Sequence, residues 1–225
     1  MASFKVRKYR DEDEEPVKEI FALGMSEHVP TSFMHMLKQP LTQMVLMCIF
    51  CALLTSSKSF LLPVLAVTLL LAGARQLVSY LFTSYIDTSL KDDLKCIRET
   101  YMEKKDSCFW VAESEGRVVG MVACLTSQTE ECLELKRMSV RRSHRGLGIA
   151  KELCKVVADF TRESGYKAVI LYTSVVQTDA QRSFHQLYLC SVLNWKPARS
   201  RYLHNAYQMF FRASWDITES LCWIY

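Results

Sequence analysis

Ser139-Val-Arg-Arg-Ser-His-Arg-Gly-Leu-Gly-Ile-Ala-Lys151 is the stretch that decides the fold, because it joins a strand to the first turn of a helix through a glycine-containing loop. Backbone N–H groups at a helix start lack intrahelical acceptors and can cradle a phosphate. Gly146 and Gly148 let the main chain approach an anion closely, and positive charge comes from Arg141, Arg142 and Arg145. A pyrophosphate fits this arrangement. The alternative is an ordinary strand-to-helix turn with a solvated basic face.

The residues on either side of this loop predict a strand, a helix and a second strand. Leu133–Val140 is the first strand, and the helix Gly146–Glu163 carries an apolar stripe made of Ala150, Leu153, Val157 and Phe160. Gly165 ends the helix, and Ala168–Tyr172 is a buried strand. Elements of these lengths predict a right-handed crossover within a mixed sheet.

Alternating apolar residues upstream of the loop predict a β-hairpin. Its strands are Cys108–Ala112 and Val118–Leu125, joined by the turn Glu113–Gly116. The remaining expected elements are a strand at Phe4–Tyr9, helices at Glu14–Gly24, Leu90–Met102 and Ala180–Val192, and closing strands at Trp195 and Ala206–Arg212. The predicted fold class is therefore α/β, with a hairpin-rich N-terminal half.

A long apolar segment interrupts this pattern. Leu41–Ala74 contains a single charge, Lys58, which reads as a turn between the arms Leu41–Ser57 and Ser59–Ala74. Positive residues on both outer flanks favour a membrane hairpin with both ends on the cytosolic side. A single tilted span through Phe60–Phe82 is one alternative, and a hairpin in a soluble core is another. The segment is expected to be an anchor and not a removed signal, with the lipid bilayer as a partner.

Composition narrows the remaining classes. A chain of 225 residues can form one full domain plus an accessory segment. The formal net charge of +4 is too small to indicate nucleic acid as a partner. The nine cysteines are scattered through apolar runs and are expected to be reduced thiols. Cys48-Ile-Phe-Cys51 has no second pair and no histidine nearby, so no metal site is expected.

Arg145-x-x-Gly148-x-Ala150, placed between a strand and an apolar helix, resembles the acetyl-coenzyme A signature of the GCN5-related N-acetyltransferases. The strings Ser107-Cys-Phe-Trp-Val-Ala-Glu-Ser114 and His144-Arg-Gly-Leu-Gly-Ile-Ala-Lys151 resemble, more narrowly, the camello-like, family 8 N-acetyltransferases. The resemblance implies the GCN5-related mixed sheet flanked by helices, with an inserted membrane hairpin. Expected divisions are 1–36 as the N-terminal strand and helix, 37–82 as the anchor and 83–225 as the acetyltransferase core.

The resemblance also implies a site. Main-chain amides from Met138 to Val140 would hold the pantetheine arm and polarise the acetyl carbonyl. The pyrophosphate would lie on the loop that the resemblance identifies, formed by Arg141, Arg142, Arg145, Gly146, Leu147, Gly148, Ile149 and Ala150. Glu134 is the candidate base, acting through water; an exposed strand carboxylate near Lys136 is the alternative. His144 is a second possible base, although beside three arginines it is more consistent with packing or phosphate binding.

The thiolate donor is the point at which the sequence departs from the family. A tyrosine is expected in the last helix, five residues before a Gly-Phe pair. An ungapped alignment from Gln177 puts Phe184 there, and alignment on Asn194-Trp195 puts Cys190 there. Tyr188 lies between these positions and is the candidate donor.

Two functions remain open from the sequence. The first is a membrane-bound N-acetyltransferase that transfers acetyl from acetyl-coenzyme A to a primary amine, either a small amino-acid conjugate or a protein lysine. The second is a membrane module that binds coenzyme A and acts in cell adhesion, trafficking and gastrulation. Family members are proteins of endoplasmic reticulum and Golgi membranes, which is the location that the resemblance implies.

Overall fold

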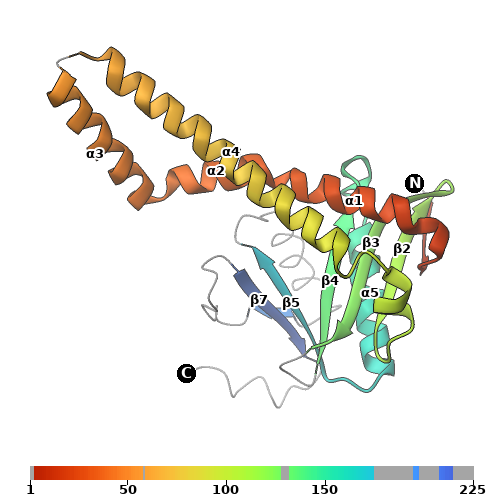
Figure 1. Ribbon diagram of the computed structural model, residues 1–225. Coiled ribbons are helices and arrows are strands. Elements are labelled where there is room, and N and C mark those ends of the chain that lie inside the picture. Colours follow the sequence, from red (N-terminus) through yellow and green to blue (C-terminus); the bar gives the residue numbers. More distant parts are fainter. Residues whose placement is uncertain (1–2, 58, 128–131, 175–194, 198–207, 215–225) are drawn as a thin grey trace. The chain divides into compact units, whose positions relative to one another are not determined.

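The computed structural model describes residues 3–57, 59–127, 132–174, 195–197 and 208–214. Its strands form one mixed sheet in the order β1-β2-β3-β4-β5-β7-β6 (Figure 1). Only β4 and β5 pair in parallel; the other neighbours are antiparallel. The strands are β1 (Phe4–Lys8), β2 (Cys108–Ser114), β3 (Arg117–Thr126), β4 (Leu133–Val140), β5 (Ala168–Ser174), β6 (Trp195–Pro197) and β7 (Gln208–Ser214).

The hairpin β2–β3 follows from its local sequence. Apolar and β-branched residues fill both strands, which are buried along most of their length. Glu115 and Gly116 join the strands with φ of 51° and 74°, the left-handed pair that a tight hairpin turn needs.

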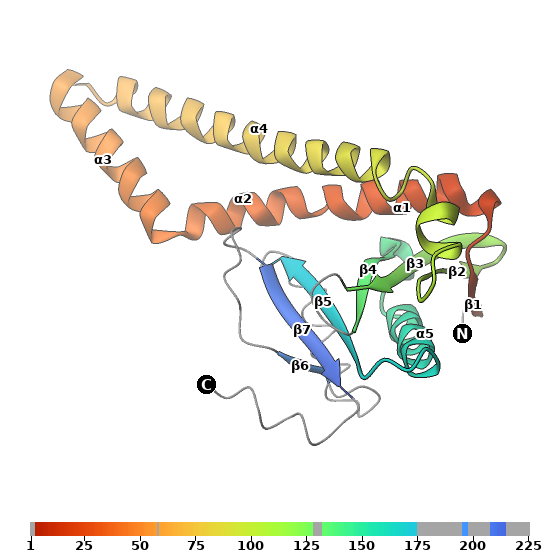
Figure 2. The same cartoon turned by 60° about the horizontal axis from the view of Figure 1, so that its bottom comes forward.

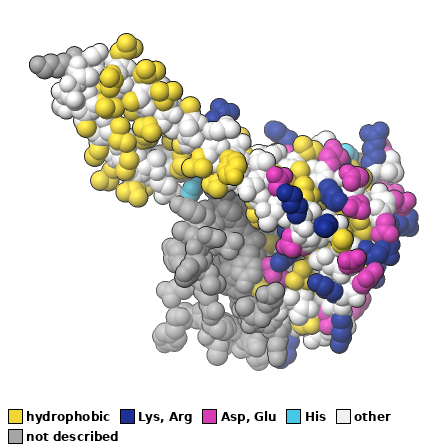
Figure 3. All heavy atoms as spheres, in the orientation of Figure 1, with side chains coloured by type: hydrophobic (Ala, Val, Ile, Leu, Met, Phe, Trp, Pro, Cys, Tyr) yellow, Lys and Arg dark blue, Asp and Glu magenta, His cyan; other side chains and the backbone are white. Residues whose placement is uncertain are grey.

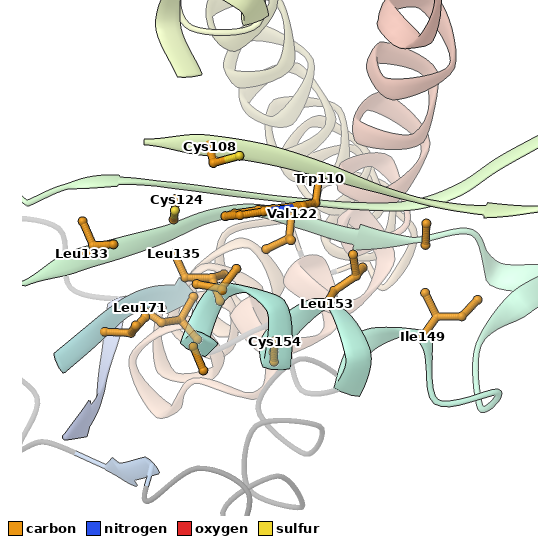
Figure 4. Close-up of a cluster of buried hydrophobic side chains, with 14 of the residues drawn as sticks. Cys108, Trp110, Val122, Cys124, Leu133, Leu135, Ile149, Leu153, Cys154 and Leu171 are labelled. Carbon is orange, nitrogen blue, oxygen red and sulfur yellow. The ribbon is translucent and has the colours of Figure 1, made fainter. Parts of the chain in front are cut away.

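One face of the sheet is covered by α5 (Ile149–Glu163). Leu153, Cys154 and Val157 pack from α5 into a core that includes Trp110, Cys124, Leu133, Leu135 and Leu171 of the strands. Figure 4 shows Ile149 and Leu153 reaching from the helix toward the strands. Trp110 also meets Phe160 edge-on, with ring centroids 5.2 Å apart. Of the predicted stripe, Leu153 and Val157 are buried, whereas Ala150 and Phe160 are half-buried at its edge.

The opposite face carries a second layer built around Phe109. Tyr9 and Tyr101 approach its ring edge-on, with centroids 5.6 Å and 5.5 Å away. Val17, Ile20 and Phe21 of α1 (Glu14–Ser26) are buried. The turn η1 (Asp11–Asp13) precedes α1, and buried Asp13 accepts hydrogen bonds from the guanidinium of Arg7 at 2.6 Å and 2.8 Å and from the Arg10 amide at 2.9 Å.

The predicted helix Leu90–Met102 is wrong as a single helix. The preceding helix, α4 (Leu61–Lys91), is followed by a bend and then by a single π-helical turn, η2 (Arg98–Met102). The Leu94 amide donates to Ser89 O at 3.1 Å, which turns the chain at this point. The bend lets Leu94, Ile97 and Tyr101 all become fully buried. The apolar spacing indicated that these residues share one face, but it suggested a continuous helix as the way to place them there.

Met25–Thr88 forms a second compact unit, separate from the unit made of Met1–Gly24 and Ser89–Tyr225. It contains α2 (His28–Lys38), α3 (Pro40–Ser57) and most of α4 (Leu61–Lys91). The second predicted arm was expected to end at Ala74; instead α4 continues through Arg75, because one charge in an apolar helix supplies no signal to stop it. Residues 37–82, the predicted anchor, lie inside this unit, and their role as an anchor stays a prediction.

Two helices of this unit are long and apolar enough to cross a membrane. These helices are α3 (Pro40–Ser57) and α4 (Leu61–Lys91). Their large apolar side chains are exposed, with Leu41 at 72% and Leu61 at 77%. Figure 3 shows hydrophobic side chains gathered over these helices.

Candidate active site

The loop between β4 and α5 has the conformation that an anion-binding loop needs. A short turn, η3 (Arg142–His144), follows β4, and Gly146 and Gly148 then adopt φ of 79° and 84°. A Cβ added at either glycine would meet no atom of the described residues within 4 Å, so the described part of the protein leaves the space above the loop open. Glycine is needed for the backbone conformation and not to relieve crowding.

The helix start supplies donors to this open space. The first turn of α5 closes with the Glu152 amide donating to Gly148 O at 3.2 Å. The amides of Ile149, Ala150 and Lys151 therefore have no acceptor one turn earlier, and no side chain among the described residues caps the helix. Since Gly148 is the N-cap, the predicted helix start at Gly146 was too early: two left-handed glycines cannot belong to a right-handed helix.

Close packing fixes the position of this helix start. Ile149 is buried, and a Cβ added at Gly120 of β3 would lie 3.1 Å from its Cγ2 and 3.4 Å from Leu153 Cδ1. Gly120 thus lets α5 approach the sheet closely.

The three arginines of the loop have different surroundings. Arg141 donates to the carboxylate of Glu19 at 3.2 Å and 2.5 Å and to Val118 O at 3.1 Å, which ties the end of β4 to α1 and β3. Arg145 Nε donates to Val140 O at 3.1 Å, and Arg142 is exposed. Arg142 and Arg145 are therefore the arginines that remain at the exposed surface of the loop.

A wedge opens between β4 and β5 beside this loop. The two strands pair only from Leu133↔Val169 to Leu135↔Leu171. Beyond Leu171, β5 continues with β7 as far as Ser174↔Gln208, while β4 continues with β3 as far as Gly120↔Val140. Figures 1 and 2 show β4 and β5 diverging after their shared segment.

Backbone donors of β4 face this wedge. The Arg141 amide donates to Val119 O of β3 at 2.8 Å, and N–H directions alternate along a strand. The amides of Val140 and Met138 therefore point away from β3, toward the edge that β5 has left. Their side chains pack against the core under α5 instead.

Comparison with known proteins identifies this arrangement. Residues 74–188 match the Acetyltransferase (GNAT) family. N-acetyltransferase 8F1 of Rattus norvegicus is 40% identical over 184 residues, which are 80% of this chain and 83% of the relative. N-acetyltransferase 8B of Homo sapiens is 38% identical over 191 residues, covering 83% of this chain and 84% of the relative. This chain belongs to the N-acetyltransferase 8 family of GNAT acetyltransferases.

Solved GNAT structures share its fold. An acetyltransferase of the GNAT family from Staphylococcus aureus superposes with a TM-score of 0.58 at 15% identity, covering 95% of this chain and 100% of the other. The paia N-acetyltransferase from Thermoplasma acidophilum, in complex with coenzyme A, gives a TM-score of 0.55 at 13% identity, covering 95% and 99%. The mixed sheet flanked by helices is thus the GNAT fold, as the sequence predicted.

Membership of the N-acetyltransferase 8 family makes the chain an acetyl-coenzyme A-dependent N-acetyltransferase, with acetyl-coenzyme A as its co-substrate. The described residues fit that co-substrate: the helix start and loop offer unpaired amides to phosphate, and the wedge offers amides to an extended arm. No group of three or more candidate metal ligands occurs among the described residues.

Glu134 of this GNAT protein lies on β4, between Leu125 of β3 and Ile170 of β5. Its side chain is 17% exposed and stands 3.6 Å from Lys136 Nζ. Burial raises the pKa of Glu134, and the nearby charges of Lys136 and Arg137 oppose that rise. A carboxylate with a raised pKa and restricted access to solvent suits a general base better than a solvated surface charge does.

The predicted site residues do not all fall in the described part of the protein. Tyr188, like Phe184 and Cys190, lies outside the described residues. His144 Nδ1 lies 2.8 Å from Ser143 Oγ on the exposed loop, not beside Glu134 on the strand. Sequence reasoning missed two further positions near the site. Gly120 could have been found, because a glycine inside a strand is a signal of close packing. The other is Arg137 of β4, which has a left-handed φ of 55°.

Proposed function

We propose that this chain is a membrane-bound N-acetyltransferase that acetylates a primary amine, either a small amino-acid conjugate or a protein lysine. The observation that carries the proposal is the wedge beyond Leu135, where outward amides of Met138 and Val140 adjoin the glycine loop. Arg142, Arg145 and the amides from Gly146 to Ala150 would hold the pyrophosphate, with Leu147 exposed between the glycines. Arg141 would act mainly by holding β4 through Glu19.

Each residue then has a defined task in the transfer. Acetyl-coenzyme A supplies the acetyl group as a thioester. Glu134 accepts a proton from the attacking amine, directly or through water, as the nitrogen bonds to the carbonyl carbon. The outward amides of β4 donate to the carbonyl oxygen as negative charge develops there. The carbon–sulfur bond breaks, and Tyr188 is the proposed donor of the proton that the departing thiolate takes.

Membrane attachment is supported by α3 and α4. At 1.5 Å per residue, α3 and the most apolar 18 residues of α4 are each about 27 Å long, close to the hydrocarbon thickness of a bilayer. Tyr80 and Tyr85, in the C-terminal half of α4, are exposed, as interfacial aromatic residues often are. The family resemblance suggests the endoplasmic reticulum and Golgi region, and roles in cell adhesion and gastrulation.

The decisive test is thiol release from acetyl-coenzyme A by membranes that contain the chain, with a panel of primary amines. A variant with Gly148→Glu places a carboxylate and a strained backbone in the loop. Turnover that the variant loses supports the proposal and begins to name the acceptor. Coenzyme A-dependent thermal stabilisation without turnover would instead favour the binding module.

Membrane attachment has its own test. The chain should stay in the pellet when microsomes that express it are washed with alkaline carbonate. Release into the supernatant would refute the membrane part of the proposal and leave the acetyltransfer part intact.

A further inference from the structure

Strand β4 contains a bulge at Arg137. Met121 of β3 pairs with Ser139, but Ala123 pairs with Lys136, so β4 carries one residue more than β3 over this interval. Arg137 has φ of 55°, a left-handed conformation that costs free energy for any residue with a Cβ. Something in the fold must hold it there.

Four side chains hold Arg137. Its Nε and Nη2 donate to the two carboxylate oxygens of Asp93 at 2.8 Å and 2.5 Å, and its Nη1 donates to Ser89 Oγ at 3.2 Å. Tyr101 donates its hydroxyl to the same Asp93 carboxylate, and the guanidinium lies 4.8 Å from the ring centre of Phe21. We call Ser89, Asp93, Tyr101, Phe21 and Arg137 the Arg137 clamp.

The clamp is buried and comes from separate parts of the chain. The side chains of Arg137 and Asp93 are only 13% and 14% exposed. Ser89 belongs to the last turn of α4, Asp93 and Tyr101 follow that helix, and Phe21 belongs to α1. A bidentate pair in this position restrains both the side chain and the backbone of Arg137.

The bulge decides which backbone groups of β4 face the wedge. Before the bulge, Lys136 opposes Ala123; after it, Ser139 opposes Met121 and the Arg141 amide donates to Val119 O. Had β4 no extra residue, Met138 would oppose Met121, and its amide would be paired with β3. The extra residue reverses this alternation, so the amides of Met138 and Val140 face outward.

We propose that the Arg137 clamp is a positioning device for the acetyl-coenzyme A site: it holds the bulge that turns these two amides toward the wedge. The inference rests on the proposed role of β4 amides in holding the pantetheine arm. Arg137 acts on the co-substrate through the backbone of its own strand and is a positioning residue.

The test compares alanine with glycine at position 137 in the full chain. Both variants lose the guanidinium and its charge near Glu134, but only glycine can adopt the left-handed conformation without strain. We expect Arg137→Ala to raise the KM for acetyl-coenzyme A at least tenfold, and Arg137→Gly to bring it back to within about threefold of the wild-type value. The KM for the amine should change less than that for acetyl-coenzyme A.

Glu115 supplies a matched control. It is also a non-glycine residue with left-handed φ, 51°, but it lies in the exposed turn between β2 and β3. Glu115→Ala and Glu115→Gly should differ in thermal stability and leave the KM for acetyl-coenzyme A unchanged. If Arg137→Ala does not fold, Asp93→Asn replaces it, and adding Arg137→Gly to Asp93→Asn should lower the raised KM.

The outcomes separate the two proposals. Equal KM values for Arg137→Ala and Arg137→Gly, in an active wild-type background, would overturn the clamp and leave the acetyltransferase proposal standing. If the wild type binds coenzyme A without turnover, the same comparison is made on coenzyme A-dependent thermal shifts. Absence of coenzyme A binding by the wild type would overturn both.

Discussion

Gly148→Ala tests whether the loop conformation itself binds the co-substrate. Gly148 has φ of 84° and ψ of 0°, and within the part of the chain that the structure describes an added Cβ would meet no atom within 4 Å. The substitution therefore introduces no clash and no charge. What it introduces is the cost of a left-handed conformation for a residue with a Cβ, about 1–2 kcal/mol.

That cost sets the size of the effect. The free variant can relax its loop toward a right-handed conformation, but binding requires the original one, so the strain is paid on binding. Since about 1.4 kcal/mol corresponds to a tenfold change in affinity, the KM for acetyl-coenzyme A should rise by roughly 5- to 30-fold. The kcat at saturating acetyl-coenzyme A should stay within about threefold of wild type.

Gly165 offers a matched control at the other end of α5. Its φ is 79° and its surroundings are equally open, so Gly165→Ala carries a similar strain. That variant should lose thermal stability without a change in KM. Steady-state thiol release at varied acetyl-coenzyme A, with a melting curve for each variant, measures both quantities. A KM within twofold of wild type for Gly148→Ala, or an equal rise for Gly165→Ala, would refute the reasoning.

Three further predictions concern other parts of the same unit. Glu134→Gln should lower kcat by about 10²–10⁴-fold, a general base's usual share. Because burial raises the pKa of Glu134, wild-type kcat/KM should fall as the pH drops through that raised pKa, and the variant should lack this acidic limb. A variant that keeps both the wild-type rate and the wild-type pH profile would exclude Glu134 as the general base. Leu153→Ala, at a fully buried position of α5, should lower the free energy of unfolding by about 2–5 kcal/mol in denaturant titrations, and a loss below 1 kcal/mol would contradict the packing in Figure 4. Burial raises the pKa of Cys124 and Cys154 to about 12, so at pH 8 iodoacetamide should label exposed Cys96 and spare both; equal labelling in peptide mass spectra would show that their burial is wrong.

Periodicity predicted the strands of the catalytic unit well because each strand carries its own signal. Cys108–Ala112, Leu133–Val140 and Ala168–Tyr172 all lie within observed strands. The first is buried along its whole length, and Leu133 and Leu135 are buried in the second. The glycine loop could also be predicted, since glycine is the residue type that adopts a left-handed φ without strain, as Gly146 and Gly148 do.

Features that depend on distant parts of the chain could not be predicted. Nothing in the local sequence indicates that Arg137 has left-handed φ, because the partner that stabilises it, Asp93, lies 44 residues away. Arg141 was assigned to phosphate from its neighbours, whereas its pairing with Glu19 depends on how α1 packs. The bend after Lys91 likewise reflects the burial of Tyr101 against Phe109, a tertiary contact.

The short parallel junction between β4 and β5 has a consequence for folding cooperativity. Among the described residues, three register pairs connect β1–β4 to β5, β7 and β6 within the sheet. Two groups of strands joined so narrowly can open as separate cooperative units, with amide protons of β5 exchanging with solvent before those of β2 and β3. A ligand that bridges the wedge couples the two groups and stabilises the whole, by about 2.7 kcal/mol at a concentration 100 times its Kd. Acetyl-coenzyme A would then stabilise the sheet by connecting β4 to β5, in addition to donating the acetyl group.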